Sequence, residues 1–426
     1  MPVVVVPRSG HPISRREIDE DCLKVLYRLN QAGHVAYLVG GGVRDLLVGM
    51  RPKDFDVATD AQPPQVRKLF RNCVLVGRRF RLAHVRFGRT VIEVSTFRSA
   101  PEPGDDASGQ DLLIRRDNTF GTAEDDALRR DFTVNALFYD ISDFSLIDWV
   151  GGLRDLEDGV IRSIGDPHVR YREDPVRMIR AMKFAARLTF EIAPDDVAAI
   201  AEHRAEISKA SVPRLLEEVF KLLRGGASAV TVRLLAEHGL LGEILPEVDS
   251  HLRRTGAAAD LEAAPFYRYL FSLDEEMHHE DHPGASNSLL LAALLMPLLN
   301  ESLQRNGGPA DCWDASPREI DDAFEHALRP VLRRLTVSRR DGDRLRAVLL
   351  LQPRLTDEGG PRSSRASQAT SRPHFHEAVE VLGLAARVHE DIGHLADAWF
   401  QAAQEVEAVD DPDEPQPRRR RRRQRP

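Results

Sequence analysis

Three consecutive glycines and a nearby arginine are the first residues in the chain whose types and spacing could do chemistry. Gly40, Gly41 and Gly42 end an apolar segment, and Arg44 follows two positions later. Glycines let backbone N–H groups approach a phosphate, and a guanidinium adds a planar pair of hydrogen-bond donors. The pattern predicts a phosphate-binding turn. The glycines alone leave open a tight turn that needs them only for positive φ angles.

The spacing of this cluster excludes two familiar phosphate motifs. A dinucleotide-binding G-x-G-x-x-G motif needs a third glycine where the chain has Asp45. A P-loop needs a Gly-Lys-Ser/Thr sequence, which is absent here. If the turn binds phosphate, it does so in a third way.

A pair of carboxylates, Asp54 and Asp56, follows the glycines. On one strand their side chains would leave the same face, near enough to share hard cations. Mg²⁺ is commonly held by one or two carboxylates plus substrate phosphates, and two ions can stabilise both the attacking and the leaving oxygen. Alone, a D-x-D pair is usually a solvated strand edge. Beside a phosphate-binding turn, it indicates nucleotidyl transfer.

The elements that must position these residues alternate between short strands and helices in the first part of the chain. The predicted elements are a helix over residues 15–33, a helical turn at Val43–Val48, and strands at Val35–Val39, Asp54–Val57, Val74–Val76, His84–Phe87 and Val91–Thr96. Residues 99–122 should form a long loop, because they are rich in Gly, Pro and Asp. Together these segments predict a small mixed sheet with flanking helices.

Beyond Asp174 the apolar residues recur at helical spacing almost to residue 402. Residues 359–373 interrupt this part with Gly, Ser and Arg, and we expect a flexible insertion there. His278, His279 and His282 lack a partner set of metal ligands at recognisable spacing, so we expect a polar loop rather than a metal site.

Composition limits the class of protein. The chain has 426 residues, of which 42% are apolar, enough for two or three domains with real cores. Its longest apolar stretch, Ser288 to Leu299, is shorter than the roughly 20 residues of a membrane span. Cys22, Cys73 and Cys312 are too dispersed for a disulfide framework. We expect a soluble cytoplasmic protein without stable membrane insertion and, by default, a monomer.

The end of the chain differs in charge from the rest of the sequence. The whole chain has a formal net charge of −8. Residues 405–414 are mostly acidic, and seven arginines follow, Arg418, Arg419, Arg420, Arg421, Arg422, Arg423 and Arg425. Such a block cannot pack into a core, because its charges repel one another. We expect a disordered tail at residues 405–426 that binds RNA through its arginines, the alternative being a merely solubilising end.

The segments GGGVRDLLVG and KDFDVAT resemble the catalytic signature of the class II tRNA nucleotidyltransferase and bacterial poly(A) polymerase superfamily. Further segments resemble the family in the same order: VIEVSTFRS (Val91 to Ser99), RRDFTVNALFYD (Arg129 to Asp140), DWVGGLRDLEDGVIRSIGDP (Asp148 to Pro167) and REDPVRMIRAMKFAARL (Arg172 to Leu188). The match therefore spans about residues 35–190.

The resemblance implies roles for individual residues. Asp54 and Asp56 would be catalytic and would bind Mg²⁺, two ions in all, with Glu93 as a further carboxylate near the metals. Asp131 matches a position that is catalytic or contacts the ribose, and Arg130 one beside the triphosphate. With these roles, Gly40, Gly41 and Arg44 become nucleotide-binding residues.

Asp174 and Arg177 are three residues apart, which places them on one face of a helix. In the family such a pair reads the edge of the incoming base. Without the resemblance, an ordinary surface ion pair between them would be the preferred interpretation.

The segment from Gly77 to Arg98, the helix at Val212 to Gly226 and the arginine tail resemble the poly(A) polymerase I branch of the family. The implied activity is transfer of AMP from ATP to an RNA 3′-hydroxyl with release of pyrophosphate. A CCA-adding tRNA nucleotidyltransferase is the alternative, and an inactive RNA-binding protein on the same scaffold is a more distant one. The partners of the expected poly(A) polymerase would be RNA 3′ ends and ATP.

Pattern and resemblance together predict an α+β fold, with a small nucleotidyltransferase-type mixed-sheet head followed by an all-helical neck and body. We expect the catalytic head at residues 15–165, the neck with base-recognition and RNA-binding helices at 166–225, and the body at 226–404.

Overall fold

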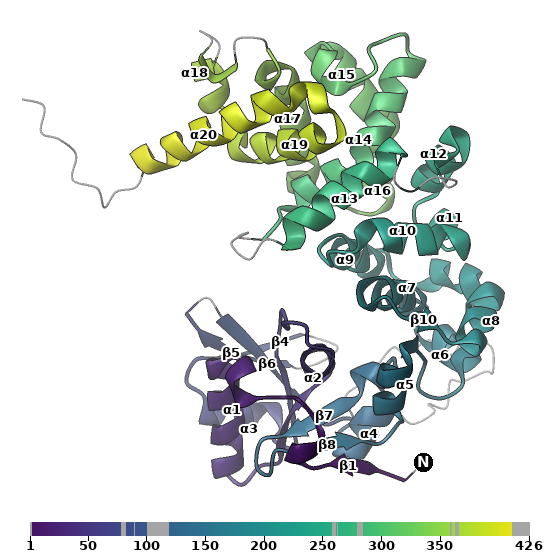
Figure 1. Cartoon of the computed structure of the whole chain (residues 1–426), viewed down its shortest axis with the longest axis vertical. Coiled ribbons are helices and arrows are strands. Elements are labelled where there is room, and N and C mark those ends of the chain that lie inside the picture. The colour runs from purple at the N-terminus through teal and green to yellow at the C-terminus, as the bar shows by residue number, and fades with distance from the viewer. Residues whose placement is uncertain are drawn as a thin grey trace, which may run out of the picture. The chain divides into compact units, whose positions relative to one another are not determined.

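The computed structural model describes residues 2–77, 82–88, 90–99, 119–257, 261, 263–278, 284–357, 360–362 and 366–410 (Figure 1). The contacts divide the chain into two compact units. The first contains residues 1–218 and 230–244, and the second contains residues 219–229 and 245–426. We describe each unit by itself.

Eight strands form the sheet of the first unit: β1 (Val4–Val6), β2 (Ala36–Val39), β3 (Asp56–Thr59), β4 (Cys73–Val76), β5 (Leu82–Phe87), β6 (Thr90–Thr96), β7 (Leu137–Asp140) and β8 (Leu146–Asp148). Their order is β1-β8-β7-β2-β3-β6-β5-β4. Only β3 and β6 are parallel neighbours, and the other pairs are antiparallel. The predicted mixed sheet is thus confirmed, but β1, β7 and β8 were not predicted.

The helices of the first unit are α1 (Glu20–Gln31), α2 (Gly41–Leu47), α3 (Pro63–Leu69), α4 (Ala123–Leu128), α5 (Gly152–Asp158), α6 (Pro167–Glu173), α7 (Val176–Leu188), α8 (Pro194–His203) and α11 (Leu241–Ile244). Two further helices, α9 (Val212–Leu223) and α10 (Ser228–Glu237), carry residues of both units. The short strands β9 (Val160–Ile161) and β10 (Glu191–Ile192) pair in parallel. The last of these lies in the part of the chain expected to be helical throughout.

Two apolar layers cover the two faces of the sheet. On one face, residues such as Leu38, Val57 and Val94 pack with Val25 and Leu26 of α1. The opposite face has a smaller cluster that includes the β2, β3 and β7 residues Val39, Ala58 and Phe138, with α4 supplying Ala127. Because successive side chains of a strand alternate between faces, the central strands β2, β3 and β7 contribute to both layers.

The second unit is helical within the described residues. Its helices are α12 (Pro246–Thr255), α13 (Pro265–His278), α14 (Asn287–Arg305), α15 (Pro317–Ala323), α16 (Arg329–Arg334), α17 (Arg339–Leu355), α18 (Ala366–Thr370), α19 (Phe375–Val388) and α20 (Gly393–Asp410). The apolar stretch Ser288 to Leu299 lies inside α14, and every residue of this stretch is buried. None of the described helices has the length and apolarity of a membrane span.

Several expected boundaries differ from the structure. The first helix begins at Glu20 rather than residue 15. The Asp19 side chain caps it, because its Oδ1 accepts hydrogen bonds from the N–H groups of Asp21 and Cys22. The expected flexible insertion at 359–373 includes α18, whose Ala369 is buried.

Other expectations concern residues at the ends of the described segments or outside them. Helix α20 extends to Asp410, so residues 405–410 are helical rather than part of a disordered tail. The tail arginines, most of the expected loop at 99–122, and His279 and His282 lie outside the described residues. Overall, the α+β class with a mixed-sheet head and a helical body is confirmed.

Candidate active site

Two neighbouring strands supply the carboxylates of the site. Asp56 opens β3, and it lies directly opposite Glu93 of the parallel strand β6. By strand alternation both belong to the face that also carries Ala58 of the smaller apolar cluster. The sheet register therefore brings together two carboxylates that are far apart in the sequence.

Asp54 precedes β3, so the two aspartates do not lie within one strand as we expected. The reason is that β2 ends at Val39, the partner of Asp56, where the chain turns into α2. A Cβ on Gly42 in that helix would lie 3.3 Å from the carbonyl oxygen of Asp54. Helix α2 thus occupies the place where the strand pairing would have continued, and Asp54 is exposed beside it.

The three carboxylates repel one another. Burial, Glu93 and Asp54 together raise the pKa of Asp56 to about 6, although Arg130 opposes the shift. Neither the Asp54 nor the Asp56 side chain forms a salt bridge or hydrogen bond with another described residue, whereas Glu93 has His84 Nε2 at 3.2 Å from its Oε1. Hard oxygen donors with uncompensated negative charge are what a divalent cation such as Mg²⁺ requires.

The glycine turn has a physical requirement for glycine at its first position. Gly40 has φ 74° and ψ −136°, a conformation that side chains disfavour. A Cβ there would also lie 2.9 Å from Nη1 of Arg130. The turn therefore brings backbone, rather than a side chain, next to this arginine.

We expect Gly40→Ala to lower nucleotide addition by at least tenfold and to destabilise the protein by about 1–3 kcal/mol, the usual cost of a strained backbone. Steady-state kinetics and urea unfolding measure the two effects. Gly49→Ala is the control, because Gly49 also has a positive φ, 73°, but its Cβ would meet nothing within 4 Å. Equal loss of activity in both variants would show that backbone strain alone, and not the contact with Arg130, matters.

Arg44 is buried in the wall of the site. Its Nε donates to Asp45 Oδ1 at 2.9 Å and its Nη1 donates to the side-chain oxygen of Asn135. The guanidinium lies 5.1 Å from the ring centre of Phe184. Since these donors are already engaged, Arg44 fixes the wall at least as much as it offers the phosphate-binding fork that we predicted.

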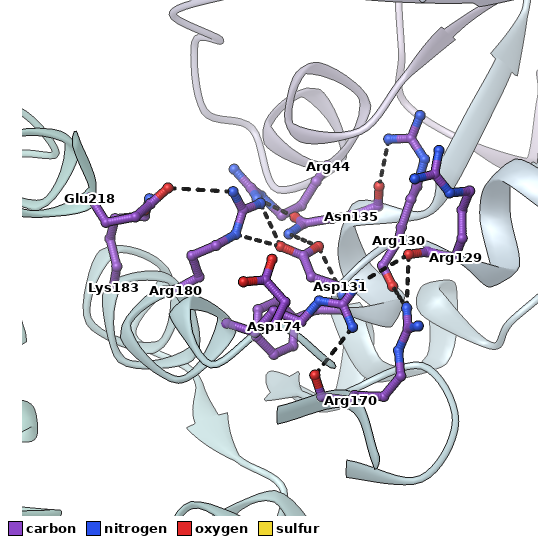
Figure 2. A network of polar contacts seen from close by, with 12 residues as sticks. Arg44, Arg129, Arg130, Asp131, Asn135, Arg170, Asp174, Arg180, Lys183 and Glu218 are labelled. Atoms are coloured by element: carbon purple, nitrogen blue, oxygen red, sulfur yellow. Dashed lines mark hydrogen bonds and ion pairs between the residues drawn. The ribbon is translucent and has the colours of Figure 1, made fainter. Parts of the chain in front are cut away.

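Asp131 is the centre of a buried hydrogen-bond network (Figure 2). Its Oδ1 accepts from the Phe132 N–H and from Asn135 Nδ2, at 2.8 and 3.1 Å. Its Oδ2 accepts from Arg180 Nε at 2.8 Å. Burial alone would raise the pKa of Asp131, but Arg180, Asn135 and the Phe132 N–H together hold it far below its usual range. With both oxygens engaged, Asp131 orients Arg180 and Asn135.

Asp174 and Arg177 do not share one helix as we expected, because Asp174 is the residue that ends α6 and Arg177 lies in the first turn of α7. They also do not form the ion pair that was the alternative interpretation. Asp174 Oδ2 accepts from Arg214 Nη2 at 2.8 Å, and its buried Oδ1 has no hydrogen-bond partner among the described residues. Arg177 Nη1 lies 3.4 Å from Glu173 Oε2. One carboxylate oxygen therefore lacks a partner among the described residues, while Arg214 fixes the other.

A cluster of arginines lies beside the carboxylates. Burial first, and then Arg98, Arg130, Arg177 and Arg170, lower the pKa of Arg129 to about 9. The pKa values of Arg98 and Arg170 are also lowered, mainly by burial. A polyanionic ligand stabilises such a cluster, because its negative charges offset the repulsion among the arginines.

These groups line one cleft of about 570 Å³, within the size range of nucleotide-sized ligand sites. Nine basic and six acidic residues line it, so the excess charge is positive. The predicted residues found in its wall are Gly40, Gly41, Arg44, Asp54, Asp56, Arg130, Asp131, Asp174 and Arg177. An adjoining hollow of about 290 Å³ shares Asp56 and Arg130 with the cleft and adds Glu93.

Sequence reasoning missed a second group of residues that the structure places in the cleft wall. They are Arg98, Arg129, Asn135, Arg180, Arg187, Arg214 and Glu218. Asn135 follows Asp131 by four residues in a segment already singled out, so the motif itself could have pointed to it. Arg180 and Glu218 also lie in segments already singled out, Arg172 to Leu188 and Val212 to Gly226. Their contact gave no signal, because only the fold brings helices α7 and α9 together, with 3.7 Å between Nη1 and Oε1.

Three family models match the chain: the poly A polymerase head domain at residues 36–162, the probable RNA- and SrmB-binding site of polymerase A at 189–252, and the polymerase A arginine-rich C-terminus at 316–426. Poly(A) polymerase I of Salmonella typhi is 42% identical over 415 residues, which cover 94% of this chain and 86% of that protein. The chain belongs to the poly(A) polymerase family. It is therefore an enzyme of the nucleotidyltransferase class.

CCA-adding enzymes are more distant relatives of this poly(A) polymerase family member. The CCA-adding enzyme of Bacillus licheniformis is 37% identical over 252 residues, covering 59% of this chain and 61% of that protein. A crystal structure of Bacillus stearothermophilus CCA-adding enzyme in complex with CTP has a TM-score of 0.59 and 27% identity, covering 92% of this chain and 82% of that one. The mixed-sheet head and helical body are thus shared across both branches.

Proposed function

We propose that this poly(A) polymerase family member extends RNA 3′ ends without a template, transferring AMP from ATP to the terminal 3′-hydroxyl and releasing pyrophosphate. The observation that carries the proposal is a single cleft in which Asp54 and Asp56 stand opposite an excess of arginines. The 42% identity to poly(A) polymerase I along most of the chain supports adenylation in particular. We further propose a monomer acting in the cytoplasm.

The residues divide the reaction between them. Asp54, Asp56 and Glu93 would hold Mg²⁺, two ions in all, which when bound supply charge neutralisation and a lower pKa for the attacking hydroxyl. Arg129 and Arg130 bind the triphosphate, and their clustered charge favours the pyrophosphate leaving group.

Base selection follows from the chemistry of the Asp174 and Arg177 pair. The free Oδ1 of Asp174 accepts a hydrogen bond from an exocyclic amine, and Arg177 donates to the ring nitrogen beside it. Adenine and cytosine both present an amine next to an acceptor nitrogen, whereas guanine and uracil present the reverse pattern. The pair therefore selects A and C over G and U, and CCA addition stays the second candidate function.

The test is extension of a labelled unstructured RNA and of a tRNA lacking its CCA end, with Mg²⁺ and each nucleoside triphosphate singly. We expect long products with ATP on the unstructured RNA. Asp54→Ala should reduce them by about 10³-fold, since metal stabilisation is worth several kcal/mol and 1.36 kcal/mol is tenfold. Asp195→Ala is the matched control, an exposed aspartate on α8 outside the cleft.

Addition of two C and one A to the tRNA alone would instead assign the chain to the CCA-adding branch. No addition to either RNA would support the inactive RNA-binding alternative. Full activity of Asp54→Ala would overturn the metal assignment while leaving the family assignment in place.

The tail should contribute to RNA affinity through charge alone. If all seven tail arginines reach phosphates, removing residues 411–426 should flatten the slope of log affinity against log salt by about 5, at roughly 0.7 per contact for single strands. Filter binding to unstructured RNA over a range of KCl concentrations measures the slope. An unchanged slope would show that the tail does not contact RNA.

For the division of the chain, we propose a catalytic head at residues 15–165, a neck at 166–225 and a body at 226–404. The proposed head supplies Asp54, Asp56 and Glu93, and the proposed neck supplies Asp174 and Arg177. The chain order of these segments supports separate roles for the metal site and for base recognition.

A further inference from the structure

Two histidines and a glutamate converge at one end of the helix pair α6 and α8, in the first unit and outside the cleft. They are His168, Glu202 and His203, and one ligand atom of each lies within 4.8 Å of the others. His168 Nδ1 is 3.1 Å from His203 Nε2 and 3.3 Å from Glu202 Oε2. His203 Nε2 is 3.8 Å from Glu202 Oε1. The two imidazoles and the carboxylate, which faces the histidines with a different oxygen each, thus form a compact group.

The size of this group matches the coordination shell of a transition metal. At Zn–N and Zn–O distances of about 2.0–2.1 Å, a tetrahedral arrangement places neighbouring ligand atoms about 3.3 Å apart. The two distances from His168 Nδ1, 3.1 Å to His203 and 3.3 Å to Glu202, lie close to this value. Two imidazoles and one carboxylate are also a ligand set that suits Zn²⁺ and its neighbours, whereas Mg²⁺ prefers oxygen ligands only.

Local structure holds the ligands in place. His168 is the second residue of α6, and its N–H donates to the capping carboxylate of Asp166 at 2.9 Å. The His168 and His203 rings meet edge to face, with their centres 5.2 Å apart. His203 is the last residue of α8 and is largely buried, whereas the Glu202 side chain is 65% exposed. The site is therefore open on the glutamate side, where a fourth ligand such as water can enter.

We propose that this cluster binds one divalent transition-metal ion of the Zn²⁺ class, which clamps α6 to α8. The opposite end of the same helix pair is already fixed, because Tyr171 O–H donates to Asp196 Oδ1 at 2.6 Å. The metal supplies the second fixed point. With three protein ligands and an open side, the site binds its ion reversibly, unlike a closed four-ligand structural zinc site.

The clamp lies at one end of a helix that reaches the cleft. From α6, Arg170 Nη2 donates to the carbonyl oxygen of Arg129 at 2.8 Å, and Asp174 caps the C-terminal end of the helix. Binding of the metal thus reduces the freedom of the segment that positions these residues. This role is independent of the Mg²⁺ ions proposed for Asp54 and Asp56.

The test measures Zn²⁺ binding to the full chain by competition with a chromophoric chelator, in excess Mg²⁺ so that the carboxylates of the cleft are occupied. We expect one equivalent of tight binding, a raised midpoint of thermal unfolding, and the visible absorption of tetrahedral Co²⁺ when Co²⁺ replaces Zn²⁺. Both His203→Gln and Glu202→Gln should weaken Zn²⁺ binding by at least about tenfold, since changes around metal ligands cost about 10–100-fold.

His238→Gln is the matched control, because His238 lies in the same unit and outside the cluster. Glu202→Gln protects the test against misfolding, since Glu202 is on the surface. If Zn²⁺ does not bind, or if both cluster variants bind it as the control does, the cluster is a histidine–histidine hydrogen bond and the proposal is wrong.

Discussion

Asp56→Asn is expected to abolish nucleotide addition and, at the same time, to stabilise the metal-free protein. The loss of activity should be about 10³-fold, as for Asp54→Ala. The gain in stability follows from the pKa of Asp56, which burial and the neighbouring carboxylates raise from 3.8 to about 6. Because solvent still reaches this side chain, we expect on the order of 1 kcal/mol at pH 8.

The pH dependence of this stabilisation has a definite sign. The folded protein binds the Asp56 proton more tightly than the unfolded chain does, so ionisation of Asp56 destabilises the fold. The cost is absent below about pH 4, grows as the pH rises, and is complete above about pH 6. The advantage of Asp56→Asn should therefore be largest at pH 8 and should vanish toward pH 4.

Urea unfolding in EDTA and in MgCl₂ measures both effects. Mg²⁺ should stabilise the wild-type protein more than Asp56→Asn, and Asp195→Asn should behave as the wild type in either condition. A variant less stable than the wild type in EDTA at pH 8 would contradict the repulsion among Asp54, Asp56 and Glu93.

Asp131→Asn should have the opposite effect on stability, with a loss of about 3 kcal/mol together with most of the activity. Breaking one partner of a buried ion pair usually costs 3–5 kcal/mol, because the other charge stays buried. Here the remaining charge is Arg180, whose Nη1 keeps Glu218 at 3.7 Å and so recovers part of the loss. Activity falls because Arg180 and Asn135 are no longer oriented in the cleft wall.

The pH dependence of Asp131 also runs opposite to that of Asp56. Its pKa is lower in the folded protein, so its carboxylate stabilises the fold. That contribution is complete above the unfolded pKa near 4 and is lost as the pH falls further toward the folded value. The difference between wild type and Asp131→Asn should stay constant from pH 8 to pH 5 and shrink below pH 4.

Urea unfolding over this pH range checks the prediction, with Asp158→Asn as control. Asp158 also faces an arginine, Arg154 at 3.5 Å, but this pair is exposed and should contribute less than 1 kcal/mol. Equal losses in the two variants would show that the Asp131 network is no stronger than a surface ion pair.

By itself, the sequence predicted the chemistry of the candidate site and located most of the elements that carry it. The glycine turn and the D-x-D pair lie within 17 residues of one another, so local spacing carries their meaning. Strands β2, β4, β5 and β6 followed from short apolar runs bounded by turn residues. The family motifs lie in order along the chain, and order needs no knowledge of the fold.

Some sequence predictions failed where pairing or packing overrides local pattern. The sequence pattern predicts that Asp54 belongs to a strand. In the structure β3 begins at Asp56, because the chain has already left its partner strand β2 and entered α2. The run Val4–Val6 becomes an edge strand only because β8 lies beside it. A strand of three residues has too little pattern of its own to be predicted.

Only the tertiary structure decided which distant residues meet. The parallel pairing of β3 with β6 sets Asp56 beside Glu93, a proximity that the family resemblance implied but that local spacing does not encode. Asp131 and Arg180 are 49 residues apart, and His168 and His203 are 35 residues apart. No periodic pattern encodes such contacts, because they arise from the packing of whole helices and strands. The sequence could therefore predict the candidate reacting groups but not the network that orients them.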